Sequence, residues 1–196
     1  VLYAQLVEGG ESLGAIMTAL RVILEQHGIP GAIYTDRASW AVYTPTSGTA
    51  PDRAKVTQVG RALARLGIEH IVSFSPQARG RSERMNRTLQ GRLVNELRVA
   101  QIRTLEAANR YLRQRFVPTL NATFGRAPAD PTSAFVPLGR GDLEQILCHQ
   151  DERVVARDNT VALDGVVMQL AKQVGRRTCA GLHVLVTLPP GPDEAA

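Results

Sequence analysis

Cysteine, aromatic residues and long apolar runs are all scarce in this sequence. Only two of the 196 residues are cysteine, which is too few for a disulfide framework and indicates a reducing compartment. Aromatic residues make up 5% of the chain, too few to support recognition of single-stranded nucleic acid by base stacking. No run approaches the roughly 20 consecutive apolar residues of a membrane-spanning helix, so we expect no membrane partner.

Lysine is also rare, because nearly all the basic residues are arginine. The chain has two lysines, Lys55 and Lys172, and 21 arginines. Residues 61–128 hold 13 basic and 4 acidic residues, a net charge of +9, whereas the two flanking thirds carry −1 and −3. The planar guanidinium pairs with two phosphate oxygens at once, so this segment favours a phosphate polymer as partner. A solvated arginine-rich helix surface would have the same composition, so both interpretations stand at this point.

Hydrophobic periodicity and turn residues predict an α/β unit followed by a small all-β module. The predicted strands of the first part are 1–7, 32–35 and 68–74, and its predicted helices are 11–27, 56–66, 82–100 and 105–116. The last helix is expected to stop at Pro118, and residues 37–55 and 75–80 are expected to be loops. Residues 127–131 are the best candidate for a linker.

Short strands are predicted after the linker. Their ranges are 153–157, 161–163, 166–170 and 183–186. Asp164-Gly165 between apolar runs is a strong hairpin signal. The proline-rich ending is expected to be disordered.

Two acidic residues, Asp36 and Glu83, stand where a reactive site is expected. Asp36 directly follows the strand predicted at 32–35, and α/β proteins place their sites at the carboxyl ends of strands. Glu83 opens the arginine-rich helix, where a helix N-terminus also attracts anions. Four polar residues share one face of that helix: Glu83, Asn86, Arg87 and Gln90. A carboxylate beside phosphate donors favours metal-dependent phosphoryl transfer, although a turn-forming Asp and a first-turn Glu are commoner explanations of each residue alone.

The residues around these acids resemble a known family. Thr35-Asp36, and the run SPQARGRSERMN from Ser75 to Asn86, are similar to the second and third acidic motifs of the retroviral-integrase-like (DDE) catalytic core. That core is shared by retroviral integrases and many bacterial insertion-sequence transposases, of which the ISNCY type is the most similar. The resemblance covers residues 1 to about 140, and the all-β segment is similar in placement to the C-terminal barrel of those transposases.

The resemblance implies an RNase H-like α/β fold in which two aspartates and a glutamate hold divalent metal, Mg²⁺ or Mn²⁺. By position, Asp36 is the second acid and Glu83 the third. The residues that it implies will meet DNA are Arg79, Arg81, Arg84, Asn86, Arg87 and Gln90. The implied activity is DNA strand transfer on transposon ends and target DNA, by a homo-multimer of the intact protein in the bacterial cytoplasm, at the nucleoid when bound to DNA.

The family's first aspartate has no counterpart in these 196 residues. It sits on the family's first strand, two strands before the one expected at 1–7, and the acids ahead of Asp36 are Glu8, Glu11 and Glu25. We therefore expect an N-terminally truncated core that lacks its first two strands, so that 1–7 has no neighbour in the sheet. We also expect the chain alone to be inactive in cutting or joining DNA.

The expected organisation is a partial integrase-like core at 1–140, a small barrel-like β-module at 141–188 and a disordered tail at 189–196. Two other interpretations use the same residues. The chain is a non-catalytic, sequence-nonspecific DNA-binding module if its arginine helices contact phosphates, and its affinity then falls steeply with salt. It is a structural α/β module if those arginines only solvate helix surfaces.

Overall fold

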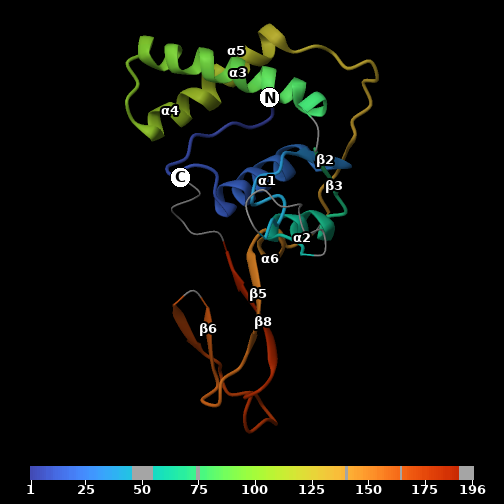
Figure 1. Cartoon of the computed structure of the whole chain (residues 1–196), viewed down its shortest axis with the longest axis vertical. Helices are drawn as coiled ribbons and strands as arrows, with labels where there is room; N and C mark the ends of the chain where they lie inside the picture. Colours follow the sequence, from blue (N-terminus) through green and yellow to red (C-terminus); the bar gives the residue numbers. More distant parts are fainter. Residues whose placement is uncertain (46–54, 74–75, 140, 164, 190–196) are drawn as a thin grey trace.

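The computed structural model of the chain has three parts arranged along its longest axis (Figure 1). A helical layer lies at one end, an α/β layer in the middle and a narrow β-module at the other end. The structure describes residues 1–45, 55–73, 76–139, 141–163 and 165–189, and only the backbone of residues 76–79 and 81. The N-terminal segment passes between the helical layer and the α/β layer.

The helices of the α/β layer begin where local capping signals place them. The layer consists of α1 (Leu13–His27), β1 (Ile29–Pro30), β2 (Ala32–Thr35), α2 (Gln58–Arg65), β3 (Glu69–Val72), β4 (Phe135–Val136) and α6 (Leu143–Ile146). The hydroxyls of Ser12 and Thr57 accept hydrogen bonds from the amides of Ala15 and Gly60 at 3.1 and 3.0 Å, and so cap α1 and α2. The predicted helices and strands that became α1, β2, α2 and β3 are thus confirmed, with ends that shift by one or two residues.

Strand pairing in this layer is partly local and partly long-range. β2 and β3 run parallel with Thr35 opposite Val72, so their carboxyl ends lie at one edge. β1 pairs antiparallel with β4, a contact that no local pattern predicts. Gly28 permits this pairing, because its φ is 94° and a Cβ there would collide with the carbonyl of Val136. Since the described strands form only two-stranded sheets, the RNase H-like arrangement stays a prediction.

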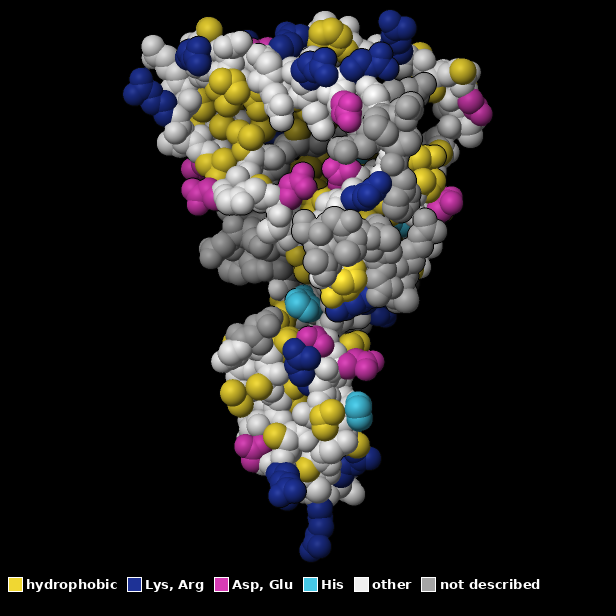
Figure 2. All heavy atoms as spheres, in the orientation of Figure 1, with side chains coloured by type: hydrophobic (Ala, Val, Ile, Leu, Met, Phe, Trp, Pro, Cys, Tyr) yellow, Lys and Arg dark blue, Asp and Glu magenta, His cyan; other side chains and the backbone are white. Residues whose placement is uncertain are grey.

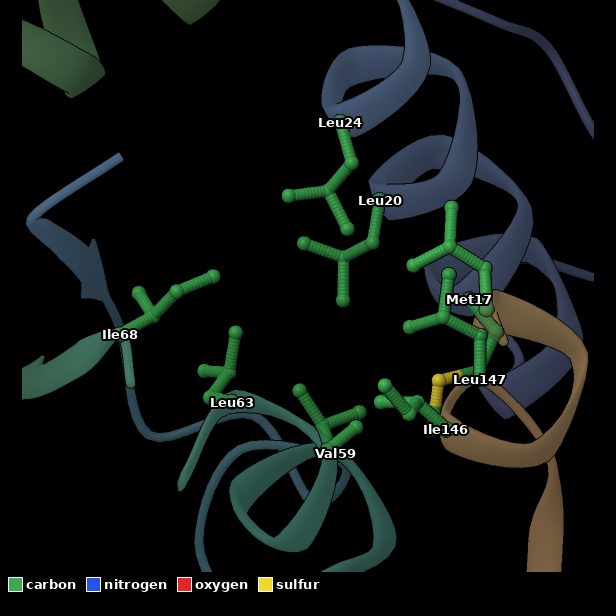
Figure 3. Close-up of a cluster of buried hydrophobic side chains, with 10 residues drawn as sticks. Met17, Leu20, Leu24, Val59, Leu63, Ile68, Ile146 and Leu147 are labelled. Carbon is green, nitrogen blue, oxygen red and sulfur yellow. The ribbon is translucent and has the colours of Figure 1, made fainter. Parts of the chain in front are cut away.

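The core of the α/β layer forms where α1, α2 and α6 meet (Figure 3). Its buried members are Met17, Leu20, Leu24, Val59, Ala62, Leu63, Ile68, Leu143, Ile146 and Leu147. The three-and-four spacing of these positions on α1 gives one apolar stripe, as the sequence predicts. Because Leu143, Ile146 and Leu147 pack into this core, α6 belongs to the α/β layer and the β-module begins after it.

The helical layer departs from the prediction at two prolines. It consists of α3 (Pro76–Val99), α4 (Leu105–Tyr111), the π-helix η1 (Leu112–Phe116) and α5 (Val117–Phe124). The predicted stop at Pro118 is wrong, because the helix continues to Phe124. A proline ring clashes with the carbonyl four residues earlier in a regular α-helix, and the wider π turn directly before α5 gives it room.

The predicted loop at 75–80 is wrong from residue 76 onward, because α3 already begins at Pro76. Proline is tolerated there, since the first amides of a helix have no acceptor within it. Glu83 is therefore the eighth residue of α3 rather than its opening residue. The anion-attracting end of the helix lies about two turns before it, which corrects the sequence-based placement.

The predicted strand at 1–7 is wrong. Among the described residues this segment pairs with no strand. Instead its Val1 and Leu6 are hydrogen-bonded to the side chains of Asn121 and Asn109 in the helical layer. Its apolar side chains Val1, Ala4 and Leu6 pack against the core of the helical layer instead of a sheet.

The β-module is open rather than barrel-like. β5 (His149–Val154) pairs with β8 (His183–Leu188), and β6 (Thr160–Leu163) pairs with β7 (Val166–Gln169), all antiparallel and, in the described chain, in two separate sheets. The predicted hairpin is confirmed, because Leu163 lies opposite Val166 and Gly165 has a φ of 79°. Asp164 itself lies outside the described residues. β5 ends at Val154, so the strand predicted at 153–157 is misplaced.

The predicted loop after β2 and the predicted linker contain neither helix nor strand in the described residues. Residues 37–45 contain only turns and bends, and the expected loop at 46–54 lies outside the described residues, as do residues 190–196 of the expected tail. The predicted linker at 127–131 lies in a segment without helix or strand. In the described part of the chain, no helix combines the length and the apolar content needed to cross a bilayer.

Candidate functional site

The first candidate residue, Asp36, lies at the carboxyl edge where the parallel strands β2 and β3 end. Hydrogen bonding between the strands continues one residue past β3, because the amide of Ser73 donates to the carbonyl of Thr35, the last residue of β2, at 2.9 Å. Asp36 therefore stands directly at this edge, where the sequence predicts it. Its side chain is half-buried.

Two hydrogen bonds fix the conformation of Asp36. Its Oδ1 accepts from the amide of Ala38 at 3.0 Å, which closes a turn directly after the strand. Its backbone carbonyl accepts from the Thr35 hydroxyl at 3.1 Å. The Ala38 amide thus holds the carboxylate at the strand end, and the Thr35 hydroxyl holds the backbone carbonyl of the same residue.

His70 on β3 extends this network. Its Nε2 lies 2.8 Å from the Thr35 Oγ1. Because the single hydroxyl hydrogen of Thr35 goes to the Asp36 carbonyl, we assign the His70 Nε2 as the protonated donor. Burial lowers the pKa of His70, which favours the neutral imidazole at neutral pH. Neither Thr35 nor His70 carries a role in the sequence prediction, and no pattern around them signals the contact.

α3 leaves from the same edge and carries the second candidate acid. It begins four residues after the end of β3, and Glu83 lies about 10 Å further along its axis. The Glu83 side chain is exposed. Asp36 thus directly follows β2, and Glu83 lies about two turns into the helix that follows β3. That the two carboxylates converge on one metal ion stays a prediction.

A stretch of α3 that includes Glu83 is exposed to solvent. Residues 82–87 are all exposed, and six consecutive residues cover more than a full helical turn. Leu89 and Leu93 are the positions on this helix that pack into the core of the helical layer. Exposure over a full turn leaves the side chains of Arg84 and Arg87 accessible to solvent.

The predicted DNA-contacting residues fall on this exposed segment or just beside it. Arg84, Asn86, Arg87 and Gln90 are all exposed on α3. Arg84 also bonds its own helix, because its Nε donates to the carbonyl of Gly80 at 2.9 Å. The side chains of Arg79 and Arg81 lie outside the described residues. Figure 2 shows Lys and Arg side chains along the end of the molecule formed by the helical layer.

The described residues do not form a complete metal site. They contain no group of three or more His, Cys, Asp or Glu side chains that could hold an ion. Carboxylate oxygens are the ligands that Mg²⁺ prefers, and Asp36 and Glu83 supply that chemistry, but two carboxylates are an incomplete set. We therefore assign no reaction step on this chain to a metal.

Comparison with known proteins identifies two transposases. The protein named "Putative transposase y4bF" of Sinorhizobium fredii is 35% identical over 176 residues, which cover 89% of this chain and 38% of that protein. The transposase for insertion sequence IS1202 of Streptococcus pneumoniae is 40% identical over 115 residues, which cover 59% of this chain and 24% of that protein. The chain is homologous to these transposases. It spans well under half the length of either relative, and no protein-family model matches it.

Proposed function

We propose that this chain is part of the DNA-acting core of an insertion-sequence transposase of the DDE type, close to the ISNCY group. In this proposal Asp36 and Glu83 are two of the acids of the whole enzyme's DNA strand-transfer site, and the exposed residues of α3 contact DNA. Transposon ends and target DNA are the substrates of that whole enzyme, which works as a multimer with Mg²⁺ or Mn²⁺. The homology to two transposases supports the DNA-directed function.

The single observation that carries the proposal is the relation of α3 to the β2–β3 edge. An exposed cationic helix starts beside a strand end that bears a conformationally fixed carboxylate. The exposed arginines offer two-point contacts to phosphate oxygens, which supports DNA as the partner of this helix.

Binding to duplex DNA over a range of salt concentrations tests the DNA-directed part of the proposal. We expect the logarithm of the affinity to fall linearly with the logarithm of salt concentration, with a slope of about −2 or steeper, because each neutralised phosphate contributes roughly −0.9. Fluorescence anisotropy with two unrelated duplex sequences measures this. A slope near zero would leave only a structural module.

The catalytic part predicts that these 196 residues alone do not join DNA. Two carboxylates hold a pair of divalent ions poorly, so we expect no strand-transfer product with either Mg²⁺ or Mn²⁺. The measurement is transfer of labelled DNA ends into a plasmid, with E83Q as the matched variant. Turnover that E83Q abolishes would contradict this prediction, and would place a full catalytic site within the chain.

A further inference from the structure

The helix α4–η1–α5 holds the backbone of the segment Val1–Val7 at two points. The amide of Leu6 donates to the Asn109 Oδ1 at 2.8 Å, and the Asn109 Nδ2 donates to the Leu6 carbonyl at 2.9 Å. The N-terminal ammonium of Val1 donates to the Asn121 Oδ1 at 2.5 Å, and the Asn121 Nδ2 donates to the Val1 carbonyl at 2.8 Å. Each carboxamide thus bonds both the donor and the acceptor of one residue, as a neighbouring β-strand would.

The spacing of the two asparagines matches an extended chain. Asn109 and Asn121 are twelve residues apart, about 18 Å along a helix at 1.5 Å per residue. The five steps from Val1 to Leu6 span about 17 Å when the chain is extended. An extended peptide therefore fits both contacts at once without bending.

The π-helix η1 brings the two asparagines onto one face. In a regular α-helix a separation of twelve residues places two side chains about 120° apart around the axis. η1 (Leu112–Phe116) lies between Asn109 and Asn121, and its wider turns wind less per residue. Five such residues remove much of that angle, so both carboxamides face the same peptide.

Apolar packing completes the contact on both sides of the segment. Val1, Ala4 and Leu6 pack against the core of the helical layer, which contains Leu112, Phe116 and Leu120. Leu2 instead lines an apolar cavity of about 350 Å³ formed mainly by α1 and β2 of the α/β layer. The segment thus contacts both layers, and it runs between them in Figure 1.

We propose that the Asn109–Asn121 face is a docking surface for an extended peptide, occupied by Val1–Val7, and that this docked segment sets the position of the helical layer over the α/β layer. α3 packs in the helical layer through Leu89 and Leu93, whereas Asp36 belongs to the α/β layer. The docked segment therefore also sets where Glu83 lies relative to Asp36. The docked segment contacts neither DNA nor metal in this proposal, so the two proposals can be tested separately.

Distance measurements between spin labels on the two layers test this proposal. Labels go on exposed positions of α1 and α3 through Q26C and R98C; the native Cys148 and Cys179 are buried, and the unlabelled parent chain checks that they take up no label. We expect a narrow distance distribution in the parent and one at least twice as wide in N121A and in N109A/N121A. N95A is the matched control, because the Asn95 carboxamide donates only to Gly91 of its own helix among the bonds described, at 3.0 Å.

The exposed Asn121 keeps the test independent of folding. Asn109 is buried, with 3% of its surface exposed, so its removal also affects the packing of α4. N121A removes an exposed side chain, and circular dichroism checks that helix content is unchanged. A distribution in N121A as narrow as in N95A overturns the proposal, whatever the double variant does.

Discussion

Replacing Arg84 and Arg87 together with glutamine is expected to weaken binding to duplex DNA roughly 60-fold at 0.1 M salt, because each phosphate contact contributes about eightfold at that concentration. Both arginines are exposed on α3 and lie three residues apart, on neighbouring positions of one surface. The slope of log affinity against log salt should decrease in magnitude by about 2. Anisotropy titrations at several salt concentrations measure both quantities.

Two ion-paired arginines provide the matched control for this loss of charge. Arg21 lies 3.9 Å from Glu25, and Arg110 lies 2.6 Å from Glu106, each four residues along the same helix. R21Q/R110Q removes the same formal charge from cations that already have a carboxylate neighbour. We expect its salt slope to equal that of the parent. Equal losses in the two double variants would mean that net charge, rather than the α3 surface, governs binding.

Elements that depend on local signals were predictable from the sequence. α1 and α2 begin at a Ser and a Thr whose hydroxyls cap the first turn, and their apolar residues follow a helical period. The β6–β7 hairpin follows from one glycine between two apolar runs. In each case the residues that determine the structure are within a few positions of one another.

Elements that depend on distant partners were not predictable. Residues 1–7 have the apolar pattern of a strand, but their backbone partners are two asparagine side chains more than 100 residues away. β1 likewise pairs with β4 across a similar separation. Pro118 was expected to stop a helix, because nothing in the local sequence reveals the π turn that accommodates it.

The residues of the candidate site likewise fall into a group that the sequence predicts and a group that only the structure reveals. A carboxylate directly after a strand and a basic helix after the next strand follow from general properties of α/β sheets, so Asp36 and α3 were identified from the sequence. The bond from His70 to Thr35 joins two strands 35 positions apart, and its geometry depends on their parallel register. Only the structure therefore adds these two residues to the site.

Replacing Leu147 with alanine is expected to lower the free energy of unfolding of the α/β layer by about 2–5 kcal/mol, because it leaves a cavity among packed side chains. Leu147 is fully buried, with 0% of its surface exposed, where α6 meets the cores of α1 and α2. The surrounding backbone has little freedom to fill the gap. The Arg61 guanidinium donates to the carbonyls on both sides of Leu147, that of Ile146 at 3.1 Å and that of Cys148 at 2.5 Å. We therefore expect a loss in the upper half of this range.

Trp40 makes the measurement specific to this layer. It is the only tryptophan of the chain and packs against the same core, so its fluorescence during urea unfolding reports on the α/β layer. L185A is the matched control, because it deletes the same atoms from a side chain of β8 that is 54% exposed. We expect that variant to leave the Trp40 transition unchanged. A loss in L147A below about 1 kcal/mol would mean that the core collapses into the space, and that Arg61 does not hold the backbone around residue 147 in place.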